Sequence, residues 1–187
     1  MYIGSVPSTG PVFTGCSLSG ASLTLTFDSA RLMGQDVVFA GNASVALENT
    51  ALYVLVGAAL PDLTSNHHAP PQDYKGPYSD GNEFGVEGWV PVSATRGRTS
   101  NTLIVDLSAL GGSVPTAVRY ASGEGGWGGK HNNRMCCGPQ VDIALQPCPP
   151  ASCPLKGSGM GALPGGPFVA AIVGGRCECT APRVCDA

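Results

Sequence analysis

Apolar side chains recur at every second position along two stretches of this chain. Residues 22–27 read Ser-Leu-Thr-Leu-Thr-Phe, so that every second side chain is apolar. In residues 102–107, Leu103, Val105 and Leu107 lie on one side of an extended chain. A period of two residues is typical of a β-strand that buries one face. Both stretches are therefore predicted to be such strands.

Other stretches are continuously apolar or too short to show a period. Residues 51–59 fit either a central strand or a short buried helix, and Tyr53, Val54 and Val56 favour the strand. No stretch shows the pattern of an amphipathic helix. Further strands are expected at residues 37–40, 44–47, 84–92, 116–121, 141–145 and 168–173.

These elements predict an all-β fold. Short strands joined by long connections favour an antiparallel β-sandwich or jelly-roll-like single domain. Residues 61–82, rich in Pro, Asp, Asn, Gly and His, are expected to form a surface loop. The expected division is a linker at 1–15, the β-sandwich domain at 16–173, and a Cys-rich, Gly/Pro-rich tail at 174–187.

Composition narrows the class of protein. The 27 glycines and 16 prolines, with only 12% charged residues, argue against a helical bundle, because its surface requires many Lys and Glu. A hydrophobic content of 43% is enough for a buried core. A formal net charge of −3 without a basic stripe argues against nucleic-acid binding. The longest uncharged apolar stretch, residues 51–60, is shorter than the roughly 20 residues that span a bilayer.

The eight cysteines are concentrated near the C-terminus, and seven of them lie in the last third of the chain. An even number with dense spacing favours disulfides in an oxidising compartment. Structural zinc is the alternative, but the chain lacks a pair of closely spaced cysteine knuckles in register. The pattern predicts a protein of the secretory pathway. The cysteines are Cys16, Cys136, Cys137, Cys148, Cys153, Cys177, Cys179 and Cys185.

The first residues do not resemble a secretory signal. Residues 1–4 carry no basic region and no apolar core of sufficient length. A cysteine pattern typical of secretion without a signal is explained most simply if the chain is the C-terminal part of a longer precursor. We therefore expect an upstream segment that is missing here.

Three segments near the C-terminus resemble, in their order, the end of sialate O-acetylesterases. They are Val118-Arg119-Tyr120-Ala121, Cys148-x4-Cys153-Pro154-Leu155, and Leu163-Pro164-x-x-Pro167-Phe168. Gly10-Pro11-Val12-Phe13 is similar to the point where the catalytic domain of that family gives way to a C-terminal β-domain. The resemblance spans nearly the whole chain, but only the non-catalytic end of the family.

The resemblance implies a function for the full-length relative. That family consists of secreted or lysosomal serine hydrolases of the SGNH type, which remove acetyl esters from sialic acids without a metal or other cofactor. This chain contains no Gly-Asp-Ser block and no Asp-x-x-His element, so no catalytic residue can be transferred to it. It is expected to be the accessory domain, with the missing N-terminal SGNH hydrolase domain as partner. O-acetylated sialic acid or a related glycan is the expected ligand of the full-length protein.

The resemblance also bears on the cysteines. It implies a disulfide between Cys148 and Cys153, while the pairing of the other cysteines stays open. Residues 122–147 are expected to be an insertion relative to the family, and the tail at 174–187 also exceeds its pattern.

A stand-alone secreted carbohydrate-binding module is the alternative function. Trp127, flanked by glycines, and Trp89 are the candidate platforms for a sugar ring, although the strand pattern around Trp89 also fits a core position. Asn42 begins an Asn-Ala-Ser sequon, which is consistent with glycosylation in a secreted protein. A third hypothesis is an independent esterase site around His67 or His131. The alternative interpretation is that these histidines are solvated loop residues.

Arg119 lies within an otherwise apolar stretch. It is expected to point outward or to pair with a carboxylate on a neighbouring strand, for which Asp106 is the candidate. This interpretation gives Arg119 a structural role.

Overall fold

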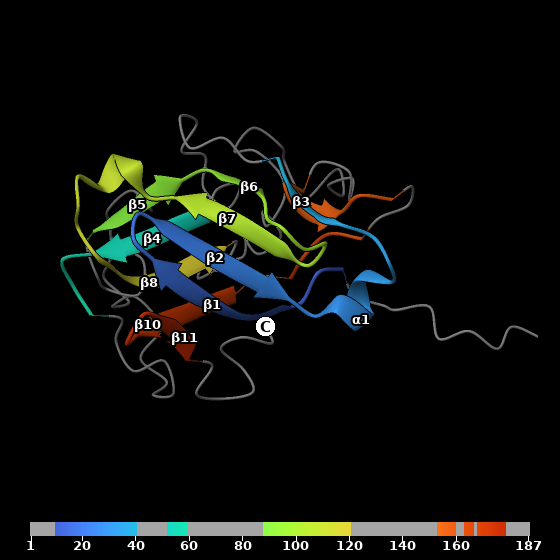
Figure 1. Ribbon diagram of the computed structural model, residues 1–187, viewed down its shortest axis with the longest axis horizontal. Coiled ribbons are helices and arrows are strands. Elements are labelled where there is room, and N and C mark those ends of the chain that lie inside the picture. Colours follow the sequence, from blue (N-terminus) through green and yellow to red (C-terminus); the bar gives the residue numbers. More distant parts are fainter. Residues whose placement is uncertain are drawn as a thin grey trace, which may run out of the picture.

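The computed structural model describes residues 10–40, 52–59, 88–120, 153–159, 163–166 and 168–178. Within these ranges antiparallel β-strands dominate (Figure 1). The strands are β1 (Phe13–Ser19), β2 (Ser22–Phe27), β3 (Val37–Phe39), β4 (Leu52–Val56), β5 (Trp89–Val92), β6 (Ala94–Arg96), β7 (Thr102–Asp106), β8 (Pro115–Tyr120), β9 (Leu155–Gly157), β10 (Phe168–Val173) and β11 (Arg176–Glu178). The described helical elements are α1 (Ser29–Leu32) and the 3₁₀ helix η2 (Ser108–Leu110).

Nine strands form one antiparallel sheet in the order β5-β4-β8-β10-β11-β1-β2-β7-β6. A second, two-stranded sheet pairs β3 with β9. The all-β, antiparallel expectation for the fold is confirmed.

The large sheet nearly closes on itself, because its two edge strands are consecutive in the chain. β5 pairs with β4 and β6 pairs with β7, and only Ser93 separates β5 from β6. The carbonyl of Ser93 accepts a hydrogen bond from the backbone N–H of Asp106 at 3.0 Å. The segment 89–96 thus forms both edges of the sheet: β5 is one edge strand, and β6, which follows after Ser93, is the other. Strands pass from one part of a sheet to another in this way at the corners of folded sheets.

The main core lies on the inner face of this folded sheet. Leu23, Leu25 and Phe27 on β2 are buried and alternate with half-buried polar residues, which confirms the expected one-faced strand. β7 likewise buries Leu103 and Val105 on one face, but it ends at Asp106, and the buried residue Leu107 precedes η2 as its N-cap.

β4 is buried on both of its faces, and this explains its continuous apolar sequence. Residues 51–59 therefore contain a strand and not a helix. Leu52 and Val54 contribute to the main core, whereas Tyr53 and Leu55 belong to a second cluster on the opposite face of the sheet. β10 matches the expected range 168–173.

Several elements differ from the expectations or lie outside the described residues. The sequence did not predict α1, β1, β6, β9 and β11. The expected strands at 44–47 and 141–145 and the segments 61–82 and 122–147 lie outside the described residues. The division at residues 15 and 173 stays a prediction. The large sheet includes Phe13, which precedes residue 15, and β11, which follows residue 173.

Candidate functional site

The segments that resemble the esterase family converge on one place in the fold. Tyr120, at the end of β8, is the register partner of Phe168, which begins β10. Their ring centroids lie 6.0 Å apart, and the ring of Phe168 stacks on that of Phe13 at 4.2 Å with an interplanar angle of 6°. All three rings are nearly inaccessible to solvent. An aromatic cluster therefore joins the start of β1 to the ends of two strands far away in the sequence.

Tyr120 also holds the segment that follows Cys153. Its phenol oxygen accepts a hydrogen bond from the backbone N–H of Leu155 at 3.3 Å. Burial of the hydroxyl raises the pKa of Tyr120 to about 12, and the hydrogen bond from Leu155 acts in the opposite direction. Tyr120 is thus a neutral side chain at physiological pH and serves as a structural acceptor.

Close backbone packing completes the cluster. The N–H of Gly165 donates to the carbonyl of Leu155 at 2.8 Å. A Cβ atom at Gly10 would lie 2.0 Å from the carbonyl oxygen of Pro164, and one at Gly165 would lie 2.5 Å from a methyl carbon of Leu155. At Gly10 the neighbouring backbone approaches too closely for any side chain, whereas at Gly165 the side chain of Leu155 occupies the space that a Cβ would need.

This arrangement, which we name the junction cluster, consists of Gly10, Phe13, Tyr120, Leu155, Pro164, Gly165 and Phe168. It is apolar, and its described side chains offer no nucleophile with an adjacent base. The contacts of its described side chains therefore hold distant segments of the chain together.

Arg119 lies on the opposite face of the sheet, between two aromatic rings. Its side chain is 2% exposed, and its guanidinium carbon lies 4.3 Å from the ring centroid of Tyr53 and 4.7 Å from that of Trp89. Such contacts stabilise a buried cation through the electron-rich ring faces. The expectation that Arg119 points outward is wrong, because β8 is an interior strand whose two faces are both covered.

Asp106 is not the partner of Arg119. β7, which carries Asp106, is not adjacent to β8 in the sheet. The carboxylate of Asp106 instead accepts a hydrogen bond from the backbone N–H of Ser108 at 2.9 Å, and hydrogen bonds from Ser108 lower the pKa of Asp106. The pairing predicted from the sequence is therefore wrong.

Trp89 is buried, with 6% of its surface exposed, and packs with Tyr53, Leu55 and Val169. This is the core position that its strand pattern favoured. Its role as a glycan contact stays a prediction. Trp127, the other candidate platform, lies outside the described residues, as does the sequon at Asn42.

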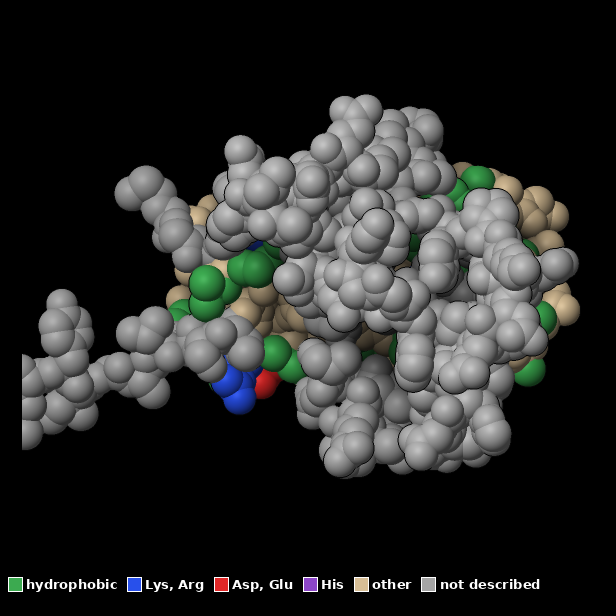
Figure 2. All heavy atoms as spheres, turned by 180° about the vertical axis from the view of Figure 1, so that it is seen from behind, with side chains coloured by type: hydrophobic (Ala, Val, Ile, Leu, Met, Phe, Trp, Pro, Cys, Tyr) green, Lys and Arg blue, Asp and Glu red, His purple; other side chains and the backbone are tan. Residues whose placement is uncertain are grey.

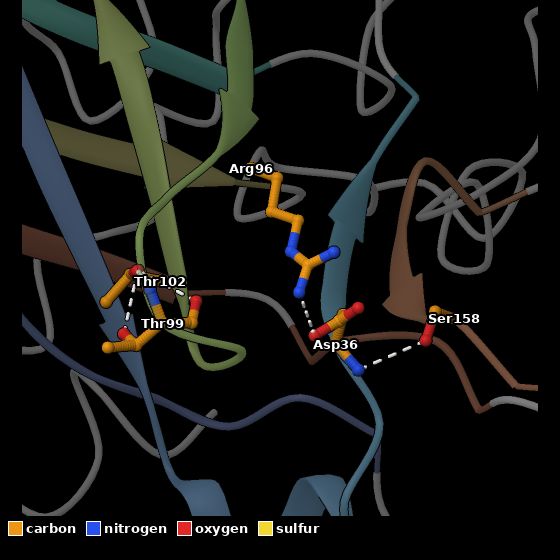
Figure 3. Close-up of polar contacts among 5 residues, drawn as sticks. All are labelled: Asp36, Arg96, Thr99, Thr102 and Ser158. Carbon is orange, nitrogen blue, oxygen red and sulfur yellow. Dashed lines mark hydrogen bonds and ion pairs between the residues drawn. The ribbon is translucent and has the colours of Figure 1, made fainter.

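A polar contact fastens the two-stranded sheet to the edge of the large one (Figure 3). A guanidinium nitrogen of Arg96 lies 2.7 Å from a carboxylate oxygen of Asp36, and the backbone N–H of Asp36 donates to the hydroxyl of Ser158 at 3.1 Å. The Arg96 side chain is 60% exposed, so this pair contributes little to stability. All three histidines of the chain lie outside the described residues, so the hypothesis of a site at His67 or His131 is not tested.

The structure pairs two cysteines whose partners the sequence left open. Cys16 on β1 and Cys177 on β11 form a disulfide with a Cα–Cα distance of 4.8 Å. Cys153 is also disulfide-bonded. Cys148 lies outside the described residues, so the pairing of Cys148 with Cys153 stays a prediction.

Three further features of the described residues bear on function. They contain no group of three or more His, Cys, Asp or Glu side chains that could hold a metal ion. None of their helices is long and apolar enough to cross a membrane. On the face drawn in Figure 2, hydrophobic side chains and tan atoms, which are other side chains and backbone, make up most of the visible described surface, and a basic and an acidic side chain lie next to each other near one edge.

Comparison with known proteins gives a distant structural neighbour. No family model matches the chain, and no curated protein sequence matches it. A solved structure of a carbohydrate acetylesterase from Xanthomonas citri is similar, with 17% sequence identity and a TM-score of 0.42. The similarity covers 89% of this chain and 23% of that esterase, so the chain spans less than a quarter of its neighbour's length.

Proposed function

We propose that this chain is the non-catalytic C-terminal β-domain of a sialate O-acetylesterase-like protein. The full-length protein removes acetyl groups from O-acetylated sialic acid or a related glycan. Its serine, histidine and aspartate belong to an SGNH hydrolase domain that precedes residue 1. The β-domain packs against that domain and completes its fold.

The single observation that carries this proposal is the convergence of the family-like segments in the junction cluster. Residues near 10, 120, 155 and 165 are far apart in the sequence, yet they meet through a phenol–amide hydrogen bond, an aromatic stack and two close glycine contacts. A set of motifs that packs together in this way is explained by one shared architecture. Chance likeness of short segments would not require them to be neighbours.

The position of the junction cluster is consistent with a role in fixing how a preceding domain is attached to the β-domain. Gly10 lies against the carbonyl of Pro164, and Asp28 donates its backbone N–H to Val12 at 2.8 Å. The chain is therefore held in place as soon as it enters the described fold. A preceding hydrolase domain would be joined to a firmly anchored segment, and its orientation relative to the β-domain would be limited.

The cysteines support the proposed compartment. The disulfide Cys16–Cys177 and the oxidised state of Cys153 are compatible with an oxidising environment. We place the protein in the secretory pathway, either secreted or in the lumen of an endomembrane compartment.

An esterase assay tests the proposal. The purified chain is incubated with 4-nitrophenyl acetate and with an O-acetylated sialic acid, and released acetate is measured. The expected rate is that of buffer alone, because the chain lacks the Gly-Asp-Ser and Asp-x-x-His blocks. Hydrolysis above background would show that the chain is itself an esterase and would refute its accessory role. A glycan array with the same sample tests the carbohydrate-binding alternative, which requires retention of a glycan.

A further inference from the structure

The large sheet has a narrow joint between β1 and β11. Among the described residues these two strands share one register pair, Ser17 with Arg176, and the backbone N–H of Leu18 donates to the carbonyl of Gly175 at 2.7 Å. On its other side, β1 pairs with β2 along its full length, from Phe13 to Ser19. β11 is likewise held to β10 over its full length. Within the described residues, β1 therefore shares fewer register pairs with β11 than with β2, and β11 shares fewer with β1 than with β10. We call the contact between β1 and β11 the joint, and the strands on either side of it the two blocks of the sheet.

The disulfide between Cys16 and Cys177 crosses this joint. Cys16 precedes Ser17 and Cys177 follows Arg176, the register pair that the described part of the two strands shows. Cys16 is 8% exposed and lies in the core, whereas Cys177 is half-buried at the surface of the core. Cys177 is therefore the more exposed of the two cysteines.

The other end of the joint is held without a disulfide. The ring of Phe13 stacks on that of Phe168, which ties the beginning of β1 to the beginning of β10. Phe27 packs edge-on against both rings at 6.0 and 6.3 Å. If β1 and β11 separated near Cys16, the contacts among Phe13, Phe27 and Phe168 would thus still hold the beginning of β1 in place.

We propose that Cys16–Cys177 is a reducible clasp that controls whether β11 stays attached to β1. A thiolate of a dithiol reductant attacks the sulfur of Cys177, and Cys16 leaves as a thiolate that takes up a proton. The second thiol of the reductant then displaces Cys177 as a thiol, and the reductant becomes a disulfide. β11 separates from β1 while the two blocks of the sheet remain folded, and the backbone edge of β1 is exposed.

Amide hydrogen exchange of the full chain tests the clasp. The double variant C16S/C177S is compared with the parent chain under non-reducing conditions, so that other disulfides stay intact. Exchange at residues 16–19 and 175–178 is expected to be at least about tenfold faster in the variant, because the joint opens locally. Exchange in β4, β7 and β8 is expected to change less than about twofold.

Leu103→Ala on β7 is the control variant, because it weakens the core without touching the joint. It is expected to raise exchange throughout the sheet and not selectively at the joint. A parallel rise in all strands of C16S/C177S would overturn the clasp, since the disulfide would then support the whole fold. Unchanged exchange at the joint would overturn it too.

A second measurement avoids dependence on the variant. The parent chain is titrated with dithiothreitol, and the thiols formed are alkylated and identified by mass spectrometry. Cys16 and Cys177 are expected to become alkylated while the protection of β4 and β8 persists. Alkylation of this pair only after that protection is lost would contradict local opening. The clasp does not rest on the proposed esterase relationship, so either can fail alone.

Discussion

Tyr120 and Leu155 are joined by a buried hydrogen bond from the backbone N–H of Leu155 to the phenol oxygen, 3.3 Å long. The two residues stand 35 positions apart and belong to two different family-like segments. Neither has solvent-accessible surface, so water cannot replace this bond. The pair therefore fixes the short strand β9 relative to the end of β8.

Replacing Tyr120 with Phe removes the acceptor and keeps the ring. The N–H of Leu155 then loses this partner in a buried environment, which costs about 1–3 kcal/mol. Urea unfolding is expected to show that loss in the free energy of unfolding with little change in its slope. A variant as stable as the parent would show that the bond contributes nothing to the junction cluster.

Tyr120 also makes stability depend on alkaline pH. Its pKa is about 12 in the folded chain and 10.0 when unperturbed, because burial disfavours the phenolate. Above about pH 10 the unfolded chain therefore releases a proton that the folded chain retains. The free energy of unfolding should fall between these two pKa values, by about 1.4 kcal/mol for each pH unit. Y120F should lack this component of the decline, and an identical decline in both proteins would contradict the assignment to Tyr120.

Gly10 and Gly15 form a matched pair for testing the close contact at the junction cluster. A Cβ at Gly10 would collide with backbone atoms of Pro164, whereas one at Gly15 would meet nothing within 4 Å. Gly10→Ala is expected to lower the free energy of unfolding by about 1–3 kcal/mol, since the backbone must shift. Gly15→Ala should be neutral or stabilise by up to about 1 kcal/mol. Equal effects in thermal and urea unfolding would argue against the contact.

Substitution of Trp89 distinguishes a structural role of this residue from a role in glycan binding. Because its ring is buried beside Arg119, Trp89→Ala is expected to cost about 3–5 kcal/mol of stability. Trp127→Ala is the comparison variant, since that residue is the other candidate platform. Unfolding and glycan titration are measured on both variants. Loss of glycan affinity in Trp89→Ala with unchanged stability would favour the carbohydrate-binding module.

The sequence predicted those strands whose burial follows a simple pattern. β2 and β7 alternate because one face is buried, and β4 and β10 are apolar because both faces are largely covered. β1 was not predicted because Gly15, Ser17 and Ser19 leave it with too few apolar residues to show a clear strand pattern. Those residues are tolerated since β1 is held by its neighbours and by a disulfide. The local pattern of apolar and polar residues does not reveal stabilisation by neighbouring strands or by a disulfide.

Long-range relationships were beyond the sequence pattern. Nothing near Cys16 indicates that its partner is Cys177, because spacing does not determine connectivity over 161 residues. Arg119 was expected outside because charged residues are rarely buried without a partner, and the rings of Tyr53 and Trp89 come from two other strands. The family-like segments, in contrast, were recognisable in the sequence, and the structure shows that they are neighbours.

The coding sequence immediately upstream of Met1 gives the most direct test of the central claim. It is determined from genomic DNA and from transcripts and is translated in frame. Our account predicts an open reading frame with a signal peptide, a Gly-Asp-Ser block and an Asp-x-x-His element before residue 1. An in-frame stop codon shortly before Met1, with no such blocks upstream, would contradict the proposal that this chain is the accessory domain of an esterase.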